Sequence, residues 1–194
     1  MKRLAVFIFL IGVSFLAYAY IGPWLGASAS ARLIYYYSRA VSVSDSSDFS
    51  ESYEDVLDPC GNGMIGYLDI PAIDIRLPIY HGTSEAALQV GVGHLPWSDL
   101  PVGGEGTHCV LVGHSGLPSS RLFTDLHMLV LGDRFSIYVL NMSLTYEVDQ
   151  VETVLSDDLS LLKTETGADL ITLVTCTPVG INSHRLLVRG HRVS

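Results

Sequence analysis

Basic residues are scarce in this chain: 11 lysines and arginines stand against 20 aspartates and glutamates in 194 residues, a net charge of −9. Nucleic-acid binding needs a basic patch, so this balance argues against a nucleic-acid partner. It also argues against docking on anionic lipid. The chain has no internal repeat, and its only low-complexity tract is rich in serine and aspartate, between residues 42 and 58. The hydrophobic content of 48% fits a globular domain plus a membrane segment.

Charge of either sign is absent from residues 4–25, an apolar run that follows Lys2 and Arg3. About 20 apolar residues in a helix are enough to span a bilayer core. Because the two basic residues precede the run, the positive-inside rule places the N-terminus in the cytoplasm and the rest of the chain outside the cell. We therefore predict a cytoplasmic start and a transmembrane anchor over residues 1–31. A cleaved signal peptide is the alternative, since residues 27–29, Ala-Ser-Ala, are acceptable as a cleavage site.

Residues 32–60 differ in composition from the segments on either side. Serine, aspartate and glutamate dominate their second half, which is typical of an exposed acidic stalk. From residue 61 onward, short apolar runs with alternating polarity are separated by turn residues, and helical periodicity is rare. Many short strands with few helices predict a mainly β domain over residues 61–194, folded as a small barrel.

No acidic residue follows Asp169, and the end of the chain carries only positive charge. The β-branched run 170–175 predicts a buried strand, and Pro178 should end that strand just after Cys176 because proline cannot continue a ladder. A second strand is expected from about Arg185 to Val193.

If these two strands are neighbours, the thiol of Cys176 lies beside the guanidinium of Arg185. Nearby positive charge favours the thiolate, which is the nucleophilic form of cysteine. A fixed guanidinium can also stabilise the oxyanion that forms when a carbonyl is attacked. A buried structural cysteine flanked by solvated arginines would leave the same pattern, so the stretch alone leaves both interpretations open.

A second stretch with chemical interest runs from Cys109 to Pro118. An apolar strand is expected to end at Gly113, which places His114 at the junction with a loop, where catalytic residues are often found. A histidine at such a place can protonate a leaving amine and later deprotonate an incoming one. Cys109, inside the apolar run, is expected to be a buried and inert thiol.

Together these motifs resemble those of the sortases, the cell-surface cysteine transpeptidases of Gram-positive bacteria. The form Asn-x-x-Arg-Leu-Leu-Val-Arg-Gly-His-Arg at 182–192 is similar in particular to the pilus-assembling class C sortases. The resemblance implies a closed barrel of about eight strands, preceded by a lid segment. It is carried by Thr-Leu-Val-Thr-Cys-Thr-Pro (172–178), by Asn182 and the run that begins at Arg185, by His114, and by the opening motifs Gly-Tyr-Leu-Asp-Ile-Pro (66–71) and Leu-Pro-Ile-Tyr-His-Gly-Thr-Ser (77–84).

The resemblance also implies an activity. Cys176 would attack the threonine carbonyl of a Leu-Pro-x-Thr-Gly sorting signal, Arg185 would hold the oxyanion, and His114 would protonate the leaving glycine amine. A pilin lysine would then take the acyl group, which polymerises pilins; transfer to a cell-wall precursor amine, which anchors surface proteins, is the alternative. Thr175 is expected either to add a hydroxyl near the oxyanion or only to pack. Neither a cofactor nor a metal is implied.

In class C sortases the lid is built on Asp-Pro followed by an aromatic residue, and the aspartate pairs with the active-site arginine. Here the corresponding residues are Asp58, Pro59 and Cys60, so Asp58 would pair with Arg185 and a cysteine stands where the aromatic is usual. In the oxidising exterior, Cys60 in that place could form a disulfide with Cys176. Class C sortases usually carry a second hydrophobic segment after the barrel, whereas this chain ends at Ser194.

Other classes explain the motifs less well. A papain-like protease needs its cysteine before its histidine, and the local signature of a caspase-like site is absent. A zinc site from Cys176, His184 and His191 has spacing unlike the usual short pairs of ligands. A non-enzymatic β module anchored in a membrane would account for the apolar start and the strands, but not for the joint occurrence of the histidine, cysteine and arginine motifs.

Overall fold

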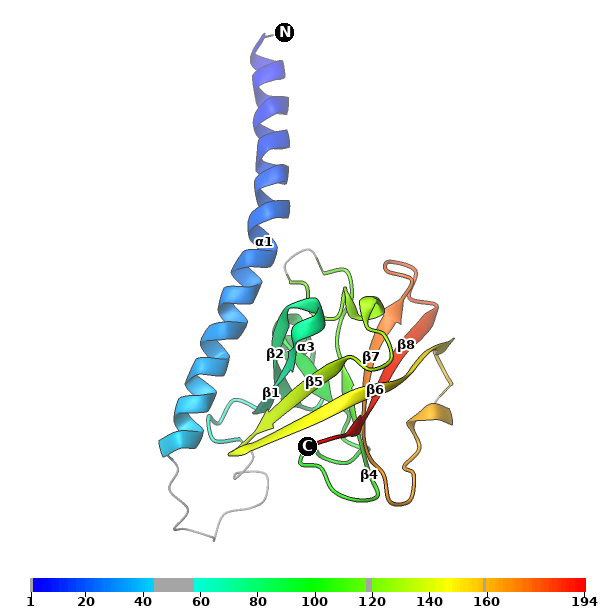
Figure 1. The fold of residues 1–194 in the computed structure, drawn as a ribbon. Helices are drawn as coiled ribbons and strands as arrows, with labels where there is room; N and C mark the ends of the chain where they lie inside the picture. Colours follow the sequence, from blue (N-terminus) through cyan, green and yellow to red (C-terminus); the bar gives the residue numbers. More distant parts are fainter. Residues whose placement is uncertain (1, 44–57, 118–119, 159) are drawn as a thin grey trace.

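The computed structural model describes residues 2–43, 58–117, 120–158 and 160–194. Eight strands close into a barrel in the order β1-β2-β3-β4-β7-β8-β6-β5, so the predicted mainly β barrel is confirmed (Figure 1). Neighbouring strands are antiparallel except for the parallel pairs β2–β3 and β4–β7. The strands are β1 (Met64–Ile70), β2 (Ile75–His81), β3 (Val92–His94), β4 (Thr107–Val112), β5 (Arg134–Val139), β6 (Met142–Leu155), β7 (Asp169–Thr177) and β8 (His184–Arg192).

Short helical segments connect the strands, as the sequence predicts. Helix α3 (Glu85–Val90) begins where Ser84 caps it: the Ser84 hydroxyl accepts a hydrogen bond from the amide of Ala87. Three single turns of 3-10 helix complete the set: η1 (Pro71–Ile73), η2 (Leu126–Met128) and η3 (Ser160–Leu162).

The main core fills the barrel, and the strands supply it through alternation. In β5 every second residue points inward, and Phe135, Ile137 and Val139 are almost fully buried. Strand β7 is different, because its apolar run has no alternation. Ile171 and Leu173 belong to the barrel core, whereas Val174 belongs to a separate cluster outside the barrel. A strand covered on both faces needs such a continuous apolar run.

Helix α1 (Lys2–Val43) is 42 residues long and runs without a break past residue 31, where the sequence suggested a boundary. Its first half extends beyond the barrel and its second half lies along it (Figure 1). The predicted transmembrane anchor over residues 1–31 is not supported, because no helix among the described residues is both long and apolar enough to cross a membrane. The predicted division of the chain at residues 31 and 60 remains a prediction.

The second half of α1 is packed against the barrel. Ile34, Tyr37 and Val41 recur at helical spacing on one face and are buried against Met64 and Tyr80. The Tyr37 hydroxyl donates to the carbonyl of Ile65 at 2.8 Å and accepts from the amide of Leu140 at 2.9 Å. The first residues of the predicted acidic stalk are therefore a docked helix. Residues 44–57, which hold most of its acidic charge, lie outside the described part of the chain.

Candidate active site

Strands β7 and β8 form an antiparallel ladder in which Cys176 lies directly opposite Arg185. Opposite residues of such a ladder have Cα atoms about 4.5–5.5 Å apart and side chains on the same face. Strand β7 ends at Thr177, one residue before Pro178, as predicted from the missing amide proton of proline. The ladder therefore puts Cys176 and Arg185 opposite one another, which is the strand pairing that the sequence indicates.

The turn between the two strands holds the Arg185 side chain. Its Nη1 donates hydrogen bonds to the carbonyls of Asn182 and His184, each at 3.0 Å. Asn182 has a left-handed backbone (φ 59°), which asparagine tolerates better than most residues, and its amide donates to the carbonyl of Pro178. The guanidinium is thereby fixed at the end of the ladder.

His114 follows β4 directly, and backbone and hydroxyl contacts on both sides tie it to β7. The amide of Gly113 donates to the carbonyl of Val174 at 3.1 Å. The hydroxyl of Thr175 donates to the carbonyl of Gly113 at 2.8 Å, and that of Ser115 donates to the carbonyl of Cys176 at 2.7 Å. The parallel pairing of β4 and β7 thus continues past the end of β4 and brings the backbone around His114 alongside that around Cys176.

The imidazole of His114 is half-buried and faces a carboxylate. Nε2 lies 3.9 Å from Oε1 of Glu85, in the first turn of α3. That same oxygen accepts a hydrogen bond from the Gln89 amide at 2.6 Å, which orients the Glu85 side chain. The Glu85 side chain is 75% exposed, so water screens its interaction with the imidazole.

Sequence reasoning missed both Ser115 and Glu85. Ser115 lies next to the predicted histidine, but nothing in its context indicates that its hydroxyl would reach the strand that carries the cysteine. Glu85 lies in a different element and approaches His114 only through the fold. Elements that are far apart in the chain and meet only in the fold, such as α3 and the residues after β4, leave no such signal in a single sequence.

Thr175 has a structural role in this arrangement. Its side chain is buried, and its only hydroxyl proton is donated to the Gly113 carbonyl. Along a strand, successive side chains point to opposite faces, so Thr175 points away from the face that carries Cys176. Of the two roles considered for Thr175, the structure fits packing and positioning, and the hydroxyl is not directed at an oxyanion.

The lid residues lie apart from the thiol. The Asp58 carboxylate accepts hydrogen bonds from the amides of Asn62, at 3.1 Å, and Gly63, at 2.7 Å. It therefore caps the turn that leads into β1, whereas the guanidinium of Arg185 contacts the carbonyls of Asn182 and His184, so the predicted ion pair between Asp58 and Arg185 is not formed among the described residues. This turn lies near the C-terminal end of α1, whereas the turn between β7 and β8 is at the other end of the barrel (Figure 1). Pro59 is part of the same turn.

All three cysteines are free, so the predicted disulfide between Cys60 and Cys176 is not formed. Cys60 packs instead in the cluster between α1 and the barrel, around Tyr37 and Met64, where burial raises the pKa of its thiol. Cys109 is buried in the barrel core, and burial raises the pKa of its thiol well above the usual value. Cys109 is the buried thiol that its apolar context predicts.

The candidate zinc ligands are spread along the ladder. His184 lies opposite Thr177 at one end of β8, and His191 lies opposite Leu170 near the other end. Seven residues of an extended strand span about 23 Å, so His184 and His191 cannot share a metal ion. Within the described ranges, no group of three or more histidine, cysteine or acidic side chains could hold a metal.

The barrel and this histidine, cysteine and arginine site define the class of the protein. A family model described as the sortase domain matches residues 68–193. The chain therefore belongs to the sortase family, as its motifs suggest. It is 33% identical over 132 residues to sortase D of Bacillus subtilis and 32% identical over 130 residues to sortase A of Bacillus anthracis. These alignments cover 66% and 67% of this chain, and 64% and 60% of the two relatives.

Solved structures of class C sortases resemble this protein more strongly. Sortase C1 from Streptococcus agalactiae is 44% identical with a TM-score of 0.75, over 84% of this chain and 98% of that one. Sortase C1 from Streptococcus suis is 51% identical with a TM-score of 0.67, over 68% and 73% of the two chains. A pilus-related sortase C of group B Streptococcus is 40% identical with a TM-score of 0.70, over 78% and 77%.

Proposed function

We propose that this protein is a cysteine transpeptidase that cleaves a Leu-Pro-x-Thr-Gly sorting signal between threonine and glycine, and passes the acyl group to a pilin lysine. One observation supports the proposal: hydrogen bonds join segment 113–115, which contains His114, to segment 174–176, which contains Cys176, and Cys176 lies opposite Arg185 in the ladder. The likeness to pilus-related class C sortases supports the choice of a pilin as acceptor. Such a reaction takes place at the cell surface, outside the membrane.

The chemistry follows from the roles of three side chains. The Cys176 thiolate attacks the threonine carbonyl, and the resulting oxyanion is stabilised by the guanidinium of Arg185. The carbon–nitrogen bond breaks as His114 gives its proton to the departing glycine amine. An incoming amine then loses a proton to His114, attacks the thioester and releases the thiol. The energy of the first peptide bond is conserved in the thioester, so no cofactor is required.

Intact mass spectrometry of the reduced protein tests the first half of the reaction. After incubation with a Leu-Pro-x-Thr-Gly peptide, we expect an acyl adduct on the wild type and none on Cys176→Ala. Cys109→Ala is the matched control, because this buried thiol is remote from the ladder end and its loss should leave the adduct in place. An adduct that persists in Cys176→Ala would exclude the proposed nucleophile, and its absence from the wild type would exclude this sorting signal.

The acceptor is tested by competition. The acylated protein is offered either a lysine-bearing pilin fragment or a cell-wall stem peptide with a free amine, and the ligated product is identified by mass. Preferential transfer to the pilin lysine supports pilus polymerisation. Preferential transfer to the stem peptide supports anchoring of surface proteins and contradicts the pilin as acceptor.

A further inference from the structure

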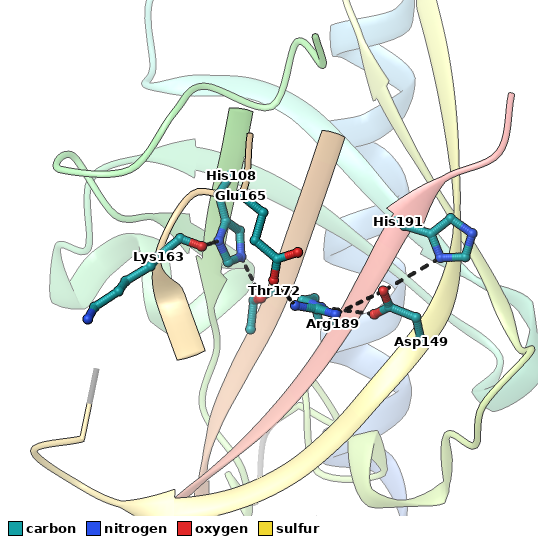
Figure 2. A network of polar contacts seen from close by, with 7 residues as sticks. All are labelled: His108, Asp149, Lys163, Glu165, Thr172, Arg189 and His191. Atoms are coloured by element: carbon teal, nitrogen blue, oxygen red, sulfur yellow. Dashed lines mark hydrogen bonds and ion pairs between the residues drawn. The ribbon is translucent and has the colours of Figure 1, made fainter. Parts of the chain in front are cut away.

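A buried histidine outside the catalytic site joins the barrel to the segment 160–168, which comprises η3 and the residues that lead into β7. His108, on β4, is only 2% exposed. Its Nδ1 lies 2.9 Å from the carbonyl oxygen of Lys163, and its Nε2 lies 2.7 Å from Oγ1 of Thr172 (Figure 2). The ring therefore bridges segment 160–168 and the outer side of β7.

The partners of His108 fix its tautomer. A carbonyl oxygen only accepts, so Nδ1 must carry the hydrogen that is donated to Lys163. In the neutral ring, Nε2 is then an acceptor, and the hydroxyl of Thr172 donates to it. A second proton on the ring would turn Nε2 into a donor, so the hydroxyl of Thr172 would have to accept instead of donate, while Nδ1 would still donate to Lys163. The geometry fits a neutral imidazole.

Segment 160–168 is held by two further contacts. Nη1 of Arg189 donates to Glu165 at 2.6 Å, while its other nitrogens bind Asp149 at 3.0 and 3.1 Å (Figure 2). Leu162 is buried against Val174, in the apolar cluster outside the barrel. Asp149, on β6, anchors Arg189. The segment therefore contacts three strands at once, through His108 on β4, Val174 on β7 and Arg189 on β8.

The place where segment 160–168 packs adjoins the catalytic pair. Val174 and Leu187 are opposite one another in the ladder, two residues along from Cys176 and Arg185. Because side chains two residues apart share a face of a strand, both pairs lie on the outer face of the barrel. Leu162 covers the first pair, so any shift of the segment changes the surface on which a peptide would approach the thiol.

We propose that neutral His108 is a positioning residue that fastens segment 160–168 beside Cys176, and that acid releases this segment and weakens binding of the acyl-donor peptide. The part that concerns the peptide rests on the proposed function. Loss of the hydrogen bond between His108 and Lys163 corresponds to about a fivefold change in the equilibrium between the fastened and the released segment, and this sets the scale of the expected effects.

The charged groups around His108 are of both signs. Arg189, on β8, opposes a second proton on the ring, whereas Glu165 and Asp99 favour it. Burial lowers the pKa of His108 below its usual value, and it outweighs both these charges and the hydrogen bond to the Lys163 carbonyl, which favours the protonated ring. The fastened segment therefore holds the ring in its neutral form, and a ring exposed by release of the segment would take up a proton more readily. The contribution of His108 to fastening is present at neutral pH, and it declines as the pH falls below about 6.5, the usual pKa of histidine, towards the lower pKa of the buried ring.

Nitrogen NMR of the imidazoles tests the assigned tautomer in the wild-type protein. At pH 7.5 we expect His108 to be neutral with its hydrogen on Nδ1. A hydrogen on Nε2, or a ring that is fully protonated at this pH, would contradict the donor and acceptor roles and overturn the proposal.

Hydrogen exchange tests the fastening without any use of catalytic activity. In His108→Leu, which has no polar group for Lys163, we expect protection of segment 160–168 to fall about fivefold at pH 7.5. His108→Asn can donate to Lys163 but cannot be charged, so it should keep protection at pH 7.5 and at pH 5.5. The wild type should lose protection between these two values. His127→Asn is the matched control, because it removes a histidine on η2 outside the network and should behave like the wild type.

The outcomes separate the proposal from simple damage to the fold. An acid response that persists in His108→Asn would overturn the proposal, even if His108→Leu does not fold. With an active enzyme, His108→Leu should raise KM for the sorting peptide about fivefold and leave kcat within twofold. An unchanged KM would overturn the link to peptide binding. Failure of the wild type to cleave any sorting peptide would instead refute the proposed function, and the exchange result would still stand.

Discussion

The hydroxyl of Thr175 donates a 2.8 Å hydrogen bond to the carbonyl of Gly113, and so joins the residue before the thiol to the residue before the imidazole. Both partners are buried. Their bond is flanked by two others, from Gly113 to Val174 and from Ser115 to Cys176. The relative position of His114 and Cys176 is therefore set by contacts between two segments of backbone, rather than by a direct bond between the two side chains.

Thr175→Val tests this positioning role. Valine has nearly the same shape but leaves the buried Gly113 carbonyl without its partner, which should lower the free energy of unfolding by about 1–3 kcal/mol. We expect kcat for peptide cleavage to fall about tenfold or more, because a small displacement of a catalytic group costs much of the rate. Thr175→Ser keeps the hydroxyl and should retain most of the activity. Urea unfolding and steady-state kinetics give the two readouts. Full activity in the valine variant would show that the bond does not position the site.

The part of the site that could be predicted from sequence is the part with a local signal. The apolar run before Cys176, the strand-ending Pro178 and the turn residues before Arg185 define two adjacent strands, and adjacent strands usually pair. His114 could be found because an apolar strand ends just before it. These signals depend on residues close together in the chain, so the pairing of Cys176 and Arg185 in the ladder matches the expectation.

The predictions that failed depend on contacts between distant segments. Asp58 is predicted to reach Arg185, but its carboxylate accepts hydrogen bonds from the amides of Asn62 and Gly63 in its own turn. These amides are nearer in the chain and would otherwise lack a hydrogen-bond acceptor. Cys60 could approach Cys176 only if it took the place of the usual aromatic residue, and it packs instead against α1. The length of α1 and its docking through Tyr37 also lacked a signal, since a helix that is apolar on most sides gives little indication of which face will be buried.

Replacement of Arg185 separates charge from geometry. Lysine keeps the positive charge, but its single ammonium cannot both contact the carbonyls of Asn182 and His184 and present a planar donor pair to an oxyanion. We expect Arg185→Lys to lower kcat about 10²-fold, with KM much less affected. Arg134→Lys, which alters an exposed ion pair with Glu147, is the control and should keep wild-type rates. A fully active Arg185→Lys would show that charge alone is enough.

The role of Asp58 is tested by Asp58→Ala. The structure gives this carboxylate two amide partners in the turn before β1, so its loss should destabilise the protein by about 0.5–2 kcal/mol. Because Asp58 does not contact Arg185, the rate of peptide hydrolysis should be unchanged. Asp58→Asn retains an acceptor oxygen and should recover part of the stability. Faster hydrolysis in Asp58→Ala would contradict this role and support an inhibitory latch.

The docking of α1 is tested at Tyr37. Tyr37→Phe removes the hydroxyl that serves both the Ile65 carbonyl and the Leu140 amide, and both backbone groups lose a buried partner. We expect a loss of about 1–3 kcal/mol in urea unfolding at pH 9. Tyr36→Phe removes the hydroxyl of an exposed neighbour and should have little effect. Equal losses in the two variants would show that the hydroxyl of Tyr37 does not secure the helix.

The same pair of variants gives a test at high pH. Burial raises the pKa of Tyr37 to about 12 in the folded protein, whereas an unfolded chain has a tyrosine pKa near 10. Below pH 10 the phenol is neutral in both states, and its full contribution to stability is present. Between pH 10 and about 12 only the unfolded state releases the proton, so the wild type loses about 1.4 kcal/mol per pH unit from this group. Tyr37→Phe has no such group. The stability difference between the wild type and Tyr37→Phe should therefore narrow by roughly 1 kcal/mol from pH 9 to pH 11. The stability difference between the wild type and Tyr36→Phe should stay the same over this range. If the difference between the wild type and Tyr37→Phe is also constant, the phenol of Tyr37 is not buried against the barrel.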